Sequence, residues 1–329
     1  MMRNNSVLSE AMTGATGVDA GSVIRLDWTE TIARLPFSGL VPQIHHAAAE
    51  LRLGRIQSPP RVIVPMGAAH GALMCMPAVS TDLTAVKLLT VLPNNAVAGL
   101  PMVQGLVSVF DAADGRPLAQ LDAEALTSRR TAAVSLAGAE RLSNAPPQTV
   151  LIVGSGVQAA SHIEAFASYF GTPNFIVAAR TRNSAEHMRA RILATRPDLR
   201  IKLITLNDLS SFAWDDVNAV VCATAARSPV LPDNVPPHVL VIAVGAYRPD
   251  MIELPARLIH QRSVAVDTIE SAQHEAGDLI HADIDWADVV ELGAIEGAPG
   301  GGSWLFKSVG HAAWDLAACR TILATSSDF

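Results

Sequence analysis

Residues 149–159 read Thr-Val-Leu-Ile-Val-Gly-Ser-Gly-Val-Gln-Ala, an apolar run that leads into a glycine turn and then into a helical pattern. A continuous apolar run is typical of a buried parallel strand. Gly154 permits a tight turn, Gly156 lets the backbone approach a pyrophosphate, and Ala159 is small where helix and strand pack closely. The amides at the start of the helix would face the phosphates. The stretch therefore predicts a dinucleotide site formed by Gly154, Ser155, Gly156, Val157, Gln158 and Ala159.

The end of the next expected strand, 174–179, indicates which dinucleotide is bound. Enzymes that use NAD usually carry Asp or Glu there, and this carboxylate holds the ribose 2′-hydroxyl. This chain has Arg180, Thr181 and Arg182 instead. A guanidinium binds a 2′-phosphate through charge-assisted hydrogen bonds, whereas a carboxylate would repel it. We therefore expect NADPH to be preferred, with NADH as the alternative if the two arginines merely lie on a solvated loop.

Composition limits the class of protein. The chain has 329 residues and is 50% hydrophobic, which is enough for two domains with large cores. Its net charge of −7, without a basic cluster, argues against nucleic acid as a partner. No apolar run is long enough to cross a bilayer, and residues 1–22 are expected to form a flexible tail rather than a signal peptide. Because the three cysteines and the scattered histidines match no disulfide or metal pattern, we expect a cytoplasmic protein that binds no metal.

The second half of the chain alternates between strand and helix patterns after Pro146-Pro147. Strands are expected at 149–154, 174–179, 201–205, 219–224, 239–244 and 263–267, with helices near 157–170 and 184–195. Such alternation predicts an α/β fold with a Rossmann-type parallel sheet over residues 146–305. Candidate cofactor-binding residues at the ends of two of these strands are Ala223, Thr224, Val244, Gly245 and Ala246.

The first part of the chain has a different pattern. Strands are expected at 22–26, 62–64, 85–91 and 105–111, and a long helix at about 122–142. Short connections predict an α+β domain that is mostly antiparallel. A flexible return over 297–303 leads to a last helix, 310–324, which is expected to pack back on this domain. The first domain is therefore expected to comprise residues 23–145 together with 306–329.

Three basic residues lie in segments that are too apolar for ordinary surface charge: Arg61, Lys87 and Arg130. Lys87 is inside the run Leu-Thr-Ala-Val-Lys-Leu-Leu-Thr-Val, where an unpaired ammonium group would cost several kcal/mol to bury. No acidic residue lies within five positions after it. A buried cation needs an anionic partner. We expect that partner to be a substrate carboxylate, and a protein–protein salt bridge is the alternative.

Five ordered motifs resemble the ornithine cyclodeaminase/μ-crystallin family over roughly residues 40–325. They are Lys87-(x5)-Pro93-x-Asn95-(x3)-Gly99, Leu126-Thr127-(x2)-Arg130-Thr131-Ala132-Ala133, Gly154-Ser-Gly-Val-Gln158-Ala159-(x2)-His162, Val244-Gly245-(x3)-Pro249-Asp250-(x2)-Glu253-Leu254 and Phe306-Lys307-Ser308-Val309-Gly310-(x4)-Asp315-Leu316. The resemblance implies a homodimer in which an α+β domain carries the substrate site and a Rossmann domain carries the nicotinamide cofactor. It also implies that Arg61, Lys87 and Arg130 hold an amino-acid carboxylate.

One position departs from the cyclodeaminases of that family. They carry an aspartate two positions after the glycine that corresponds to Gly245, whereas this chain has Tyr247 there. A phenol does not replace a carboxylate as a base at neutral pH. Tyr247 and the segment that contains His311 and Trp314 instead look like members that reduce the cyclic ketimines Δ1-pyrroline-2-carboxylate and Δ1-piperideine-2-carboxylate to L-proline and L-pipecolate. His311 is a further substrate-site candidate, unless it is an ordinary helix residue.

The resemblance thus implies an NADPH-dependent imine reductase in which Arg61 and Arg130 anchor the substrate carboxylate and Lys87 is the catalytic residue. Two other functions stay open at this point. One is an ornithine cyclodeaminase or a related amino-acid dehydrogenase. The other is a crystallin-like protein that binds small ligands without catalysis, although a pure binding role does not call for three buried cations.

Overall fold

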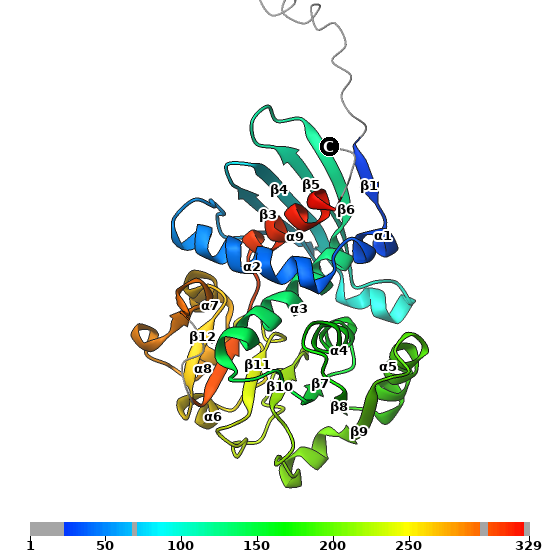
Figure 1. Ribbon diagram of the computed structural model, residues 1–329, viewed down its shortest axis with the longest axis vertical. Coiled ribbons are helices and arrows are strands. Elements are labelled where there is room, and N and C mark those ends of the chain that lie inside the picture. The colour runs from blue at the N-terminus through cyan, green and yellow to red at the C-terminus, as the bar shows by residue number, and fades with distance from the viewer. Residues whose placement is uncertain (1–22, 68–70, 297–301, 326–329) are drawn as a thin grey trace, which may run out of the picture.

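A computed structural model describes residues 23–67, 71–296 and 302–325. The expected tail at 1–22 lies outside the described residues, as does most of the expected return at 297–303. The described residues form two sheets, which Figure 1 shows one above the other with helices between them.

The glycine turn belongs to an eight-stranded sheet in which every pair of neighbouring strands is parallel. Its strand order is β13-β12-β14-β11-β10-β7-β8-β9. The strands are β7 (Thr149–Val153), β8 (Asn174–Ala179), β9 (Arg200–Thr205), β10 (Ala219–Cys222), β11 (Leu240–Ala243), β12 (Ser263–Val266), β13 (Val290–Glu291) and β14 (Trp304–Lys307). The α/β fold with a Rossmann-type sheet is confirmed, and the six expected strands lie within two residues of their expected bounds.

Helices cover this sheet as the alternating pattern predicts (Figure 1). They are α4 (Val157–Tyr169), α5 (Arg182–Thr195), α6 (Ala256–His260), α7 (Ile269–Glu275) and α8 (Gly277–His281), with short 3₁₀ helices η3 (Leu206–Ser211), η4 (Trp286–Asp288) and η5 (Leu292–Ala294). The strands β13 and β14 were not expected. One has two residues and the other is a four-residue segment that ends in Lys307, so neither has a pattern that distinguishes it from a loop.

The other sheet has six strands in the order β1-β6-β5-β4-β3-β2. They are β1 (Ile24–Leu26), β2 (Val62–Met66), β3 (Gly71–Val79), β4 (Leu83–Val91), β5 (Val103–Asp111) and β6 (Pro117–Asp122), with η2 (Pro93–Ala98) between β4 and β5. Its pairs are antiparallel except β1 with β6, which agrees with the expectation from short connections. The strands β3 and β6 were missed because few of their residues are strong strand formers: β3 is rich in methionine and alanine, and β6 contains proline, alanine, glutamine and aspartate.

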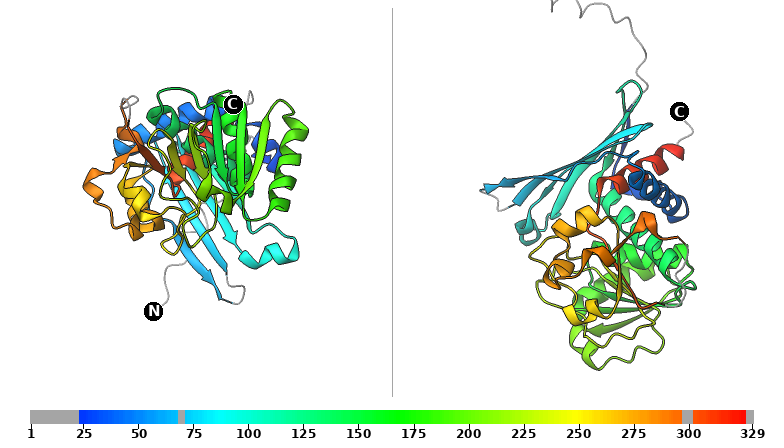
Figure 2. Two further views of the ribbon diagram at one scale, coloured as in Figure 1. Left: turned by 90° about the horizontal axis from the view of Figure 1, so that it is seen from below. Right: turned by 90° about the vertical axis from the view of Figure 1, so that its left-hand side faces the viewer.

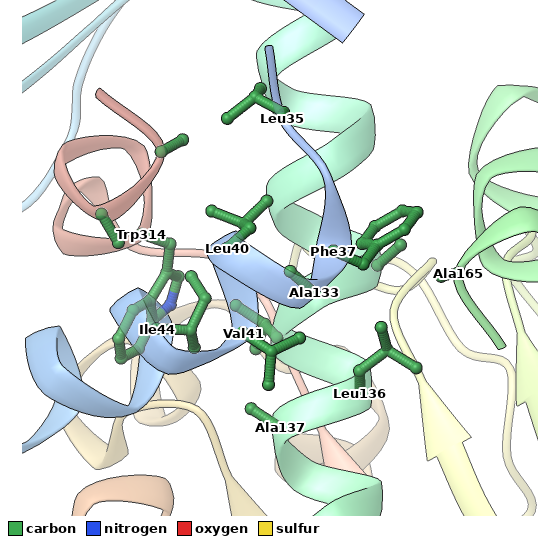
Figure 3. Close-up of a cluster of buried hydrophobic side chains, with 14 of the residues drawn as sticks. Leu35, Phe37, Leu40, Val41, Ile44, Ala133, Leu136, Ala137, Ala165 and Trp314 are labelled. Carbon is green, nitrogen blue, oxygen red and sulfur yellow. The ribbon is translucent and has the colours of Figure 1, made fainter. Parts of the chain in front are cut away.

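One face of the six-stranded sheet is covered by helices. These are α1 (Trp28–Ala33), α2 (Phe37–Arg52), α3 (Ala123–Leu142) and α9 (Ala312–Ala324). Figure 3 shows the apolar side chains through which α2, α3 and α9 meet, among them Ile44, Val41 and Trp314. Leu40, Ile44 and Trp314 are fully buried. The last helix therefore packs back on the first domain as the sequence predicts.

The position at which the chain passes back from the parallel-sheet domain to the first domain was predicted wrongly. Phe306 and Lys307 were assigned to the first domain, but β14 places them between β11 and β12 of the parallel sheet. The chain leaves that sheet only at Ser308. Among the described residues, no α-helix covers the opposite face of the six-stranded sheet, and Figure 2 shows the sheet reaching beyond the rest of the molecule on one side.

The packing of α3 against β14 predicts opposite effects for two helical glycines. A Cβ atom at Gly138 would lie 2.6–2.8 Å from the Phe306 ring, whereas one at Gly39 in α2 would meet nothing closer than 3.5 Å. We expect Gly138→Ala to lower the free energy of unfolding by about 1–3 kcal/mol because the buried ring must move. Gly39→Ala should raise it by up to about 1 kcal/mol, since alanine favours the helix. Urea unfolding measures both, and a stabilised Gly138→Ala variant would show that α3 and β14 are not in close contact.

Candidate active site

The glycine turn has the geometry that a bound pyrophosphate needs. Gly154 has a φ of 124°, and a Cβ atom there would lie 2.6 Å from the carbonyl oxygen of Ala223. Gly156 is the N-cap of α4, makes no side-chain cap, and has open space where a Cβ would be. The first N–H groups of a helix have no partner within the helix. The first hydrogen bond of the helix runs from Ala160 N to Gly156 O, so the amides of Val157, Gln158 and Ala159 are available to phosphate oxygens and the turn fits a dinucleotide.

A buried carboxylate fixes the two neighbouring strand ends. Glu253 Oε1 accepts hydrogen bonds from the backbone N and Oγ1 of Thr224, at 2.7 and 2.8 Å. Its Oε2 accepts from the backbone N atoms of Gly245 and Ala246, at 2.7 and 3.0 Å. Burial raises the pKa of Glu253, and the charge of Lys307 opposes that rise. Four donors around one carboxylate hold the loops after β10 and β11 in a single arrangement.

The candidates Ala223 and Val244 complete this edge of the sheet. Ala223 N donates to Val153 O at 2.9 Å, and Val244 N donates to Cys222 O at 2.9 Å. The ends of β7, β10 and β11 therefore lie side by side, with Gly154 next to Ala223. In open parallel sheets ligands bind at the carboxyl ends of the strands. The structure brings the expected phosphate turn and the expected nicotinamide loops to one edge.

The end of β8 carries no carboxylate. Arg180, directly after this strand, is exposed. Thr181 caps α5 through Ser184 N, and Ser184 Oγ accepts from Ser155 Oγ at 3.0 Å. Arg182 is exposed and forms an ion pair with Glu186 at 2.9 Å. The hydroxyl of Ser184, which the sequence did not single out, thus joins the phosphate turn to this strand end.

Lys87 points from β4 into the interior and is paired there. Its Nζ lies 3.0 Å from Asp315 Oδ1, 2.9 Å from Asp315 Oδ2 and 3.3 Å from Thr127 Oγ1. Burial lowers the pKa of Lys87 to about 8, although the charge of Asp315 opposes this shift. The anion beside Lys87 is therefore an aspartate of the same chain, 228 positions away, whereas the sequence predicted a substrate carboxylate or, as the alternative, a protein–protein salt bridge.

Asp315 also joins Lys87 to Arg130. Arg130 Nε, on α3, lies 3.1 Å from Asp315 Oδ1, and both side chains are almost wholly buried. Gly310 covers the guanidinium, since a Cβ atom there would lie 2.7 Å from Arg130 Nη1. One carboxylate on α9 is thus shared by two cations from β4 and α3.

Arg61 approaches the same region from the other side. Its Nη2 donates to Gly310 O at 2.8 Å and to Val309 O at 3.2 Å. The same atom lies 2.7 Å from Glu275 Oε2, at the end of α7 in the parallel-sheet domain. Arg61 is therefore held at the boundary of the two domains.

Asp267 holds the segment that connects these groups. It accepts hydrogen bonds from Ser308 Oγ and Gly310 N, both at 2.8 Å. His311 caps α9, and its Nδ1 accepts from Ala313 N at 3.2 Å. Burial lowers the pKa of His311, which keeps the ring neutral as this cap requires. Since Ser308 N donates to Ala243 O at 3.0 Å, this segment also starts beside the cofactor edge.

The structure thus brings Arg61, Lys87, Arg130 and His311 together around residues 309–315, next to the expected nicotinamide loops. Four carboxylates that organise the site were not proposed as site residues: Glu253, Asp267, Glu275 and Asp315. Asp315 could have been identified from the sequence, because a lone acidic residue in the apolar helix 312–324 needs a buried cationic partner. Asp250, three residues after Tyr247, instead faces Arg248 and Arg227 at the surface.

A family model described as the ornithine cyclodeaminase/mu-crystallin family matches residues 27–328. The chain belongs to this family. It is 38% identical over 297 residues to the Δ1-pyrroline-2-carboxylate/Δ1-piperideine-2-carboxylate reductase of Azospirillum brasilense, covering 90% of this chain and 93% of that protein. It is 39% identical to the Δ1-pyrroline-2-carboxylate reductase 2 of Burkholderia ambifaria, with the same coverage. The ketimine reductase mu-crystallin of Mus musculus is 32% identical, over 86% of this chain and 90% of that protein.

Solved structures share the fold. Thermococcus litoralis Δ1-pyrroline-2-carboxylate reductase, in complex with NADH and L-proline, superposes with a TM-score of 0.82 at 23% identity, covering 92% of this chain and 97% of that one. An archaeal alanine dehydrogenase, solved as a dimer with bound NAD, gives 0.80 at 23% identity, with 92% and 95% coverage. Within the described ranges, no helix has the length and apolar character to span a membrane, and no cluster of three or more His, Cys, Asp or Glu side chains could hold a metal ion.

Proposed function

We propose that this protein reduces cyclic ketimines with a nicotinamide cofactor, converting Δ1-pyrroline-2-carboxylate to L-proline and Δ1-piperideine-2-carboxylate to L-pipecolate. The observation that carries this proposal is the group formed by Arg61, Lys87 and Arg130 beside the strand ends that fit a dinucleotide. The names of relatives at 38–39% identity support it.

The cofactor would be held by the turn after β7 and by the loops after β10 and β11. When bound, the reduced nicotinamide supplies the hydride that the imine carbon accepts. The substrate carboxylate would be bound by Arg61 and Arg130, whose planar guanidinium groups fix one face of the ring. Of the Arg61 nitrogens, Nη2 alone has partners among the described residues, so Nε and Nη1 are available for this carboxylate.

Lys87 would donate a proton to the imine nitrogen. With a pKa of about 8 it is protonated at neutral pH, yet it loses its proton more readily than an exposed lysine. Protonation makes the imine carbon electrophilic, and a well-placed acid contributes about 10²–10⁴-fold to such a step. After the transfer, Asp315 keeps Arg130 as its counter-ion.

Lys87→Ala should lower kcat for both imines by about 10²–10⁴-fold while NADPH binding stays near the wild-type level. The matched control is Lys202→Ala, which removes an exposed lysine from β9. The assay follows the loss of NADPH absorbance with each imine, and NADPH affinity is measured by fluorescence. Wild-type turnover in Lys87→Ala would show that Lys87 is not the acid.

No NADPH oxidation by the wild type would rule out the reductase, and ammonia release from L-ornithine without net cofactor consumption would identify a cyclodeaminase.

We also propose that NADPH is preferred over NADH. The support is the pair of exposed arginines after β8, where no carboxylate stands to repel a 2′-phosphate. Arg180 is the better candidate of the two because Arg182 is already paired with Glu186. The hydroxyls of Thr181 and Ser184 lie at the same strand end, next to that of Ser155 in the turn after β7, and would add hydrogen bonds.

Arg180→Ala should raise KM for NADPH by about tenfold or more and leave KM for NADH within about twofold, because only the phosphate contact is lost. Arg191→Ala, which removes an exposed arginine from α5, the helix that follows Arg180, is the control. Steady-state kinetics with both cofactors decide the point. Equal losses for NADPH and NADH would argue against a 2′-phosphate contact.

Finally, we propose a homodimer that covers the helix-free face of the six-stranded sheet. Leu73, Leu88 and Leu106 are 38–41% exposed there, and Leu88 and Leu106 are directly paired on neighbouring strands. An apolar sheet face of this kind marks an interaction surface. A second copy of the chain can bring an identical face to it.

The double variant Leu88→Glu/Leu106→Glu should be monomeric, because two buried carboxylates per subunit would be desolvated at the interface. Leu53→Glu, at the end of α2, is the control, since Leu53 is 63% exposed and lies on the helical side of the sheet. Light scattering after size-exclusion chromatography gives the mass. A dimeric double variant would place the interface elsewhere.

A further inference from the structure

Arg61 and Glu275 form a contact that the proposed reaction does not use. The two side chains come from different domains, Arg61 from the position before β2 and Glu275 from the end of α7, and they meet at 2.7 Å. Both are mostly buried, with 11% and 20% of the side chains exposed. Glu275 is thus the counter-ion of a residue that is expected to bind the substrate carboxylate.

The charges around this pair are balanced before any substrate enters. The cations are Arg61, Lys87 and Arg130, and the carboxylates are Asp267, Glu275 and Asp315. Lys87 and Arg130 share Asp315, and Arg61 has Glu275. A substrate carboxylate would therefore bring one uncompensated negative charge into a buried site, which is costly unless another group changes its charge.

Glu275 is the acid in this group that most easily becomes neutral. Asp315 lies against two cations, and Asp267 accepts several backbone and side-chain hydrogen bonds. Glu275 Oε2 is buried and, among the described residues, receives no hydrogen bond of good geometry. Three charged or titratable groups act on it: Arg61 just before β2, Asp267 after β12, and its neighbour His274 on α7.

We propose that Glu275 takes up a proton from solvent when a substrate carboxylate binds to Arg61, so that the anion and the proton enter the site together. This inference rests on the proposed function, because it assumes that Arg61 binds the substrate. Glu275 is a positioning residue. In the empty site its carboxylate aligns Arg61, and when the substrate binds, protonation neutralises Glu275 and ends its ion pair with the guanidinium. The proton returns to solvent when the product carboxylate leaves.

The direction of the pH effect follows from the electrostatics. Burial raises the pKa of Glu275 to about 7, even though Arg61 opposes the shift. Below that pH the carboxyl is neutral and Arg61 has its full charge for the substrate. Above it, the ionised carboxylate competes with the substrate for Arg61. The affinity for a substrate carboxylate should therefore fall as the pH rises through about 7.

The kinetic experiment compares KM for the imine between pH 6 and pH 8.5. Wild-type KM should rise by about tenfold or more, since each pH unit above the pKa lowers the fraction of Glu275 that is protonated by about tenfold. Glu275→Gln should have a lower KM than the wild type at pH 8.5 and lose most of this rise. Ionisation of Lys87 and of the substrate affects both proteins equally, so it cancels in the comparison. Glu270→Gln removes an exposed charge from the same helix and should behave like the wild type.

A second experiment needs no turnover. Pyrrole-2-carboxylate is a planar ring that carries the carboxylate but has no imine to reduce. Its binding at pH 7.5, with NADP+ present, is measured by calorimetry in two buffers of different ionisation enthalpy. Wild type should take up a substantial fraction of one proton and Glu275→Gln close to none.

These outcomes separate the two proposals. Proton uptake in the wild type without any imine reduction would overturn the proposed function and leave the role of Glu275 standing. Imine reduction with the same KM profile or the same proton uptake in Glu275→Gln would overturn the role of Glu275 alone. If Glu275→Gln does not fold, the wild type still decides: a flat KM profile between pH 6 and pH 8.5, or no binding of the ring carboxylate at pH 6, counts against the inference.

Discussion

The pairing of Asp315 with both Lys87 and Arg130 is the contact on which the site depends. Each cation lies on a different element of the first domain, and neither could be buried without an anion, because desolvation of an unpaired charge costs several kcal/mol. Asp315 supplies that anion from the last helix. It thereby fixes α9 against β4 and α3, and it sets the distance between the two cations before any ligand binds. A buried ion pair of this kind is weak evidence for stability but good evidence for a defined geometry.

Buried carboxylates also join separate elements around the expected cofactor site. Glu253 joins the loops after β10 and β11, and Asp278 receives the backbone N–H groups of Glu253 and Leu254 while it pairs with Lys307 at 2.8 Å. Lys307 lies in β14, next to the segment that carries Gly310 and His311. The two halves of the site are therefore connected through buried carboxylates rather than through the flexible surface. This arrangement keeps the backbone amides and the cations in place while both ligands exchange.

Much of this could be predicted from the sequence, for a clear physical reason. The glycine turn, the alternating strands and the long helix that carries Arg130 are local patterns, and a cation inside an apolar strand is a local anomaly that demands a partner. The identity of the partner is not local: Asp315 is 228 residues from Lys87, and Glu275 meets Arg61 only across a domain boundary. The strands β3 and β6 were not predicted because they contain few strong strand formers, and β13 and β14 were not predicted because they are short. The roles of Arg61, Lys87, Arg130 and His311 stay predictions.

The position of β14 has a consequence for how the chain can fold. This strand lies between β11 and β12, in the interior of the parallel sheet, and the chain then runs directly into α9, which fills the core of the other sheet. Residues 304–324 are thus the last piece of both cores. During synthesis neither domain can close before this segment leaves the ribosome, so the two domains are expected to become stable together, as one cooperative unit, rather than in the order in which they are made.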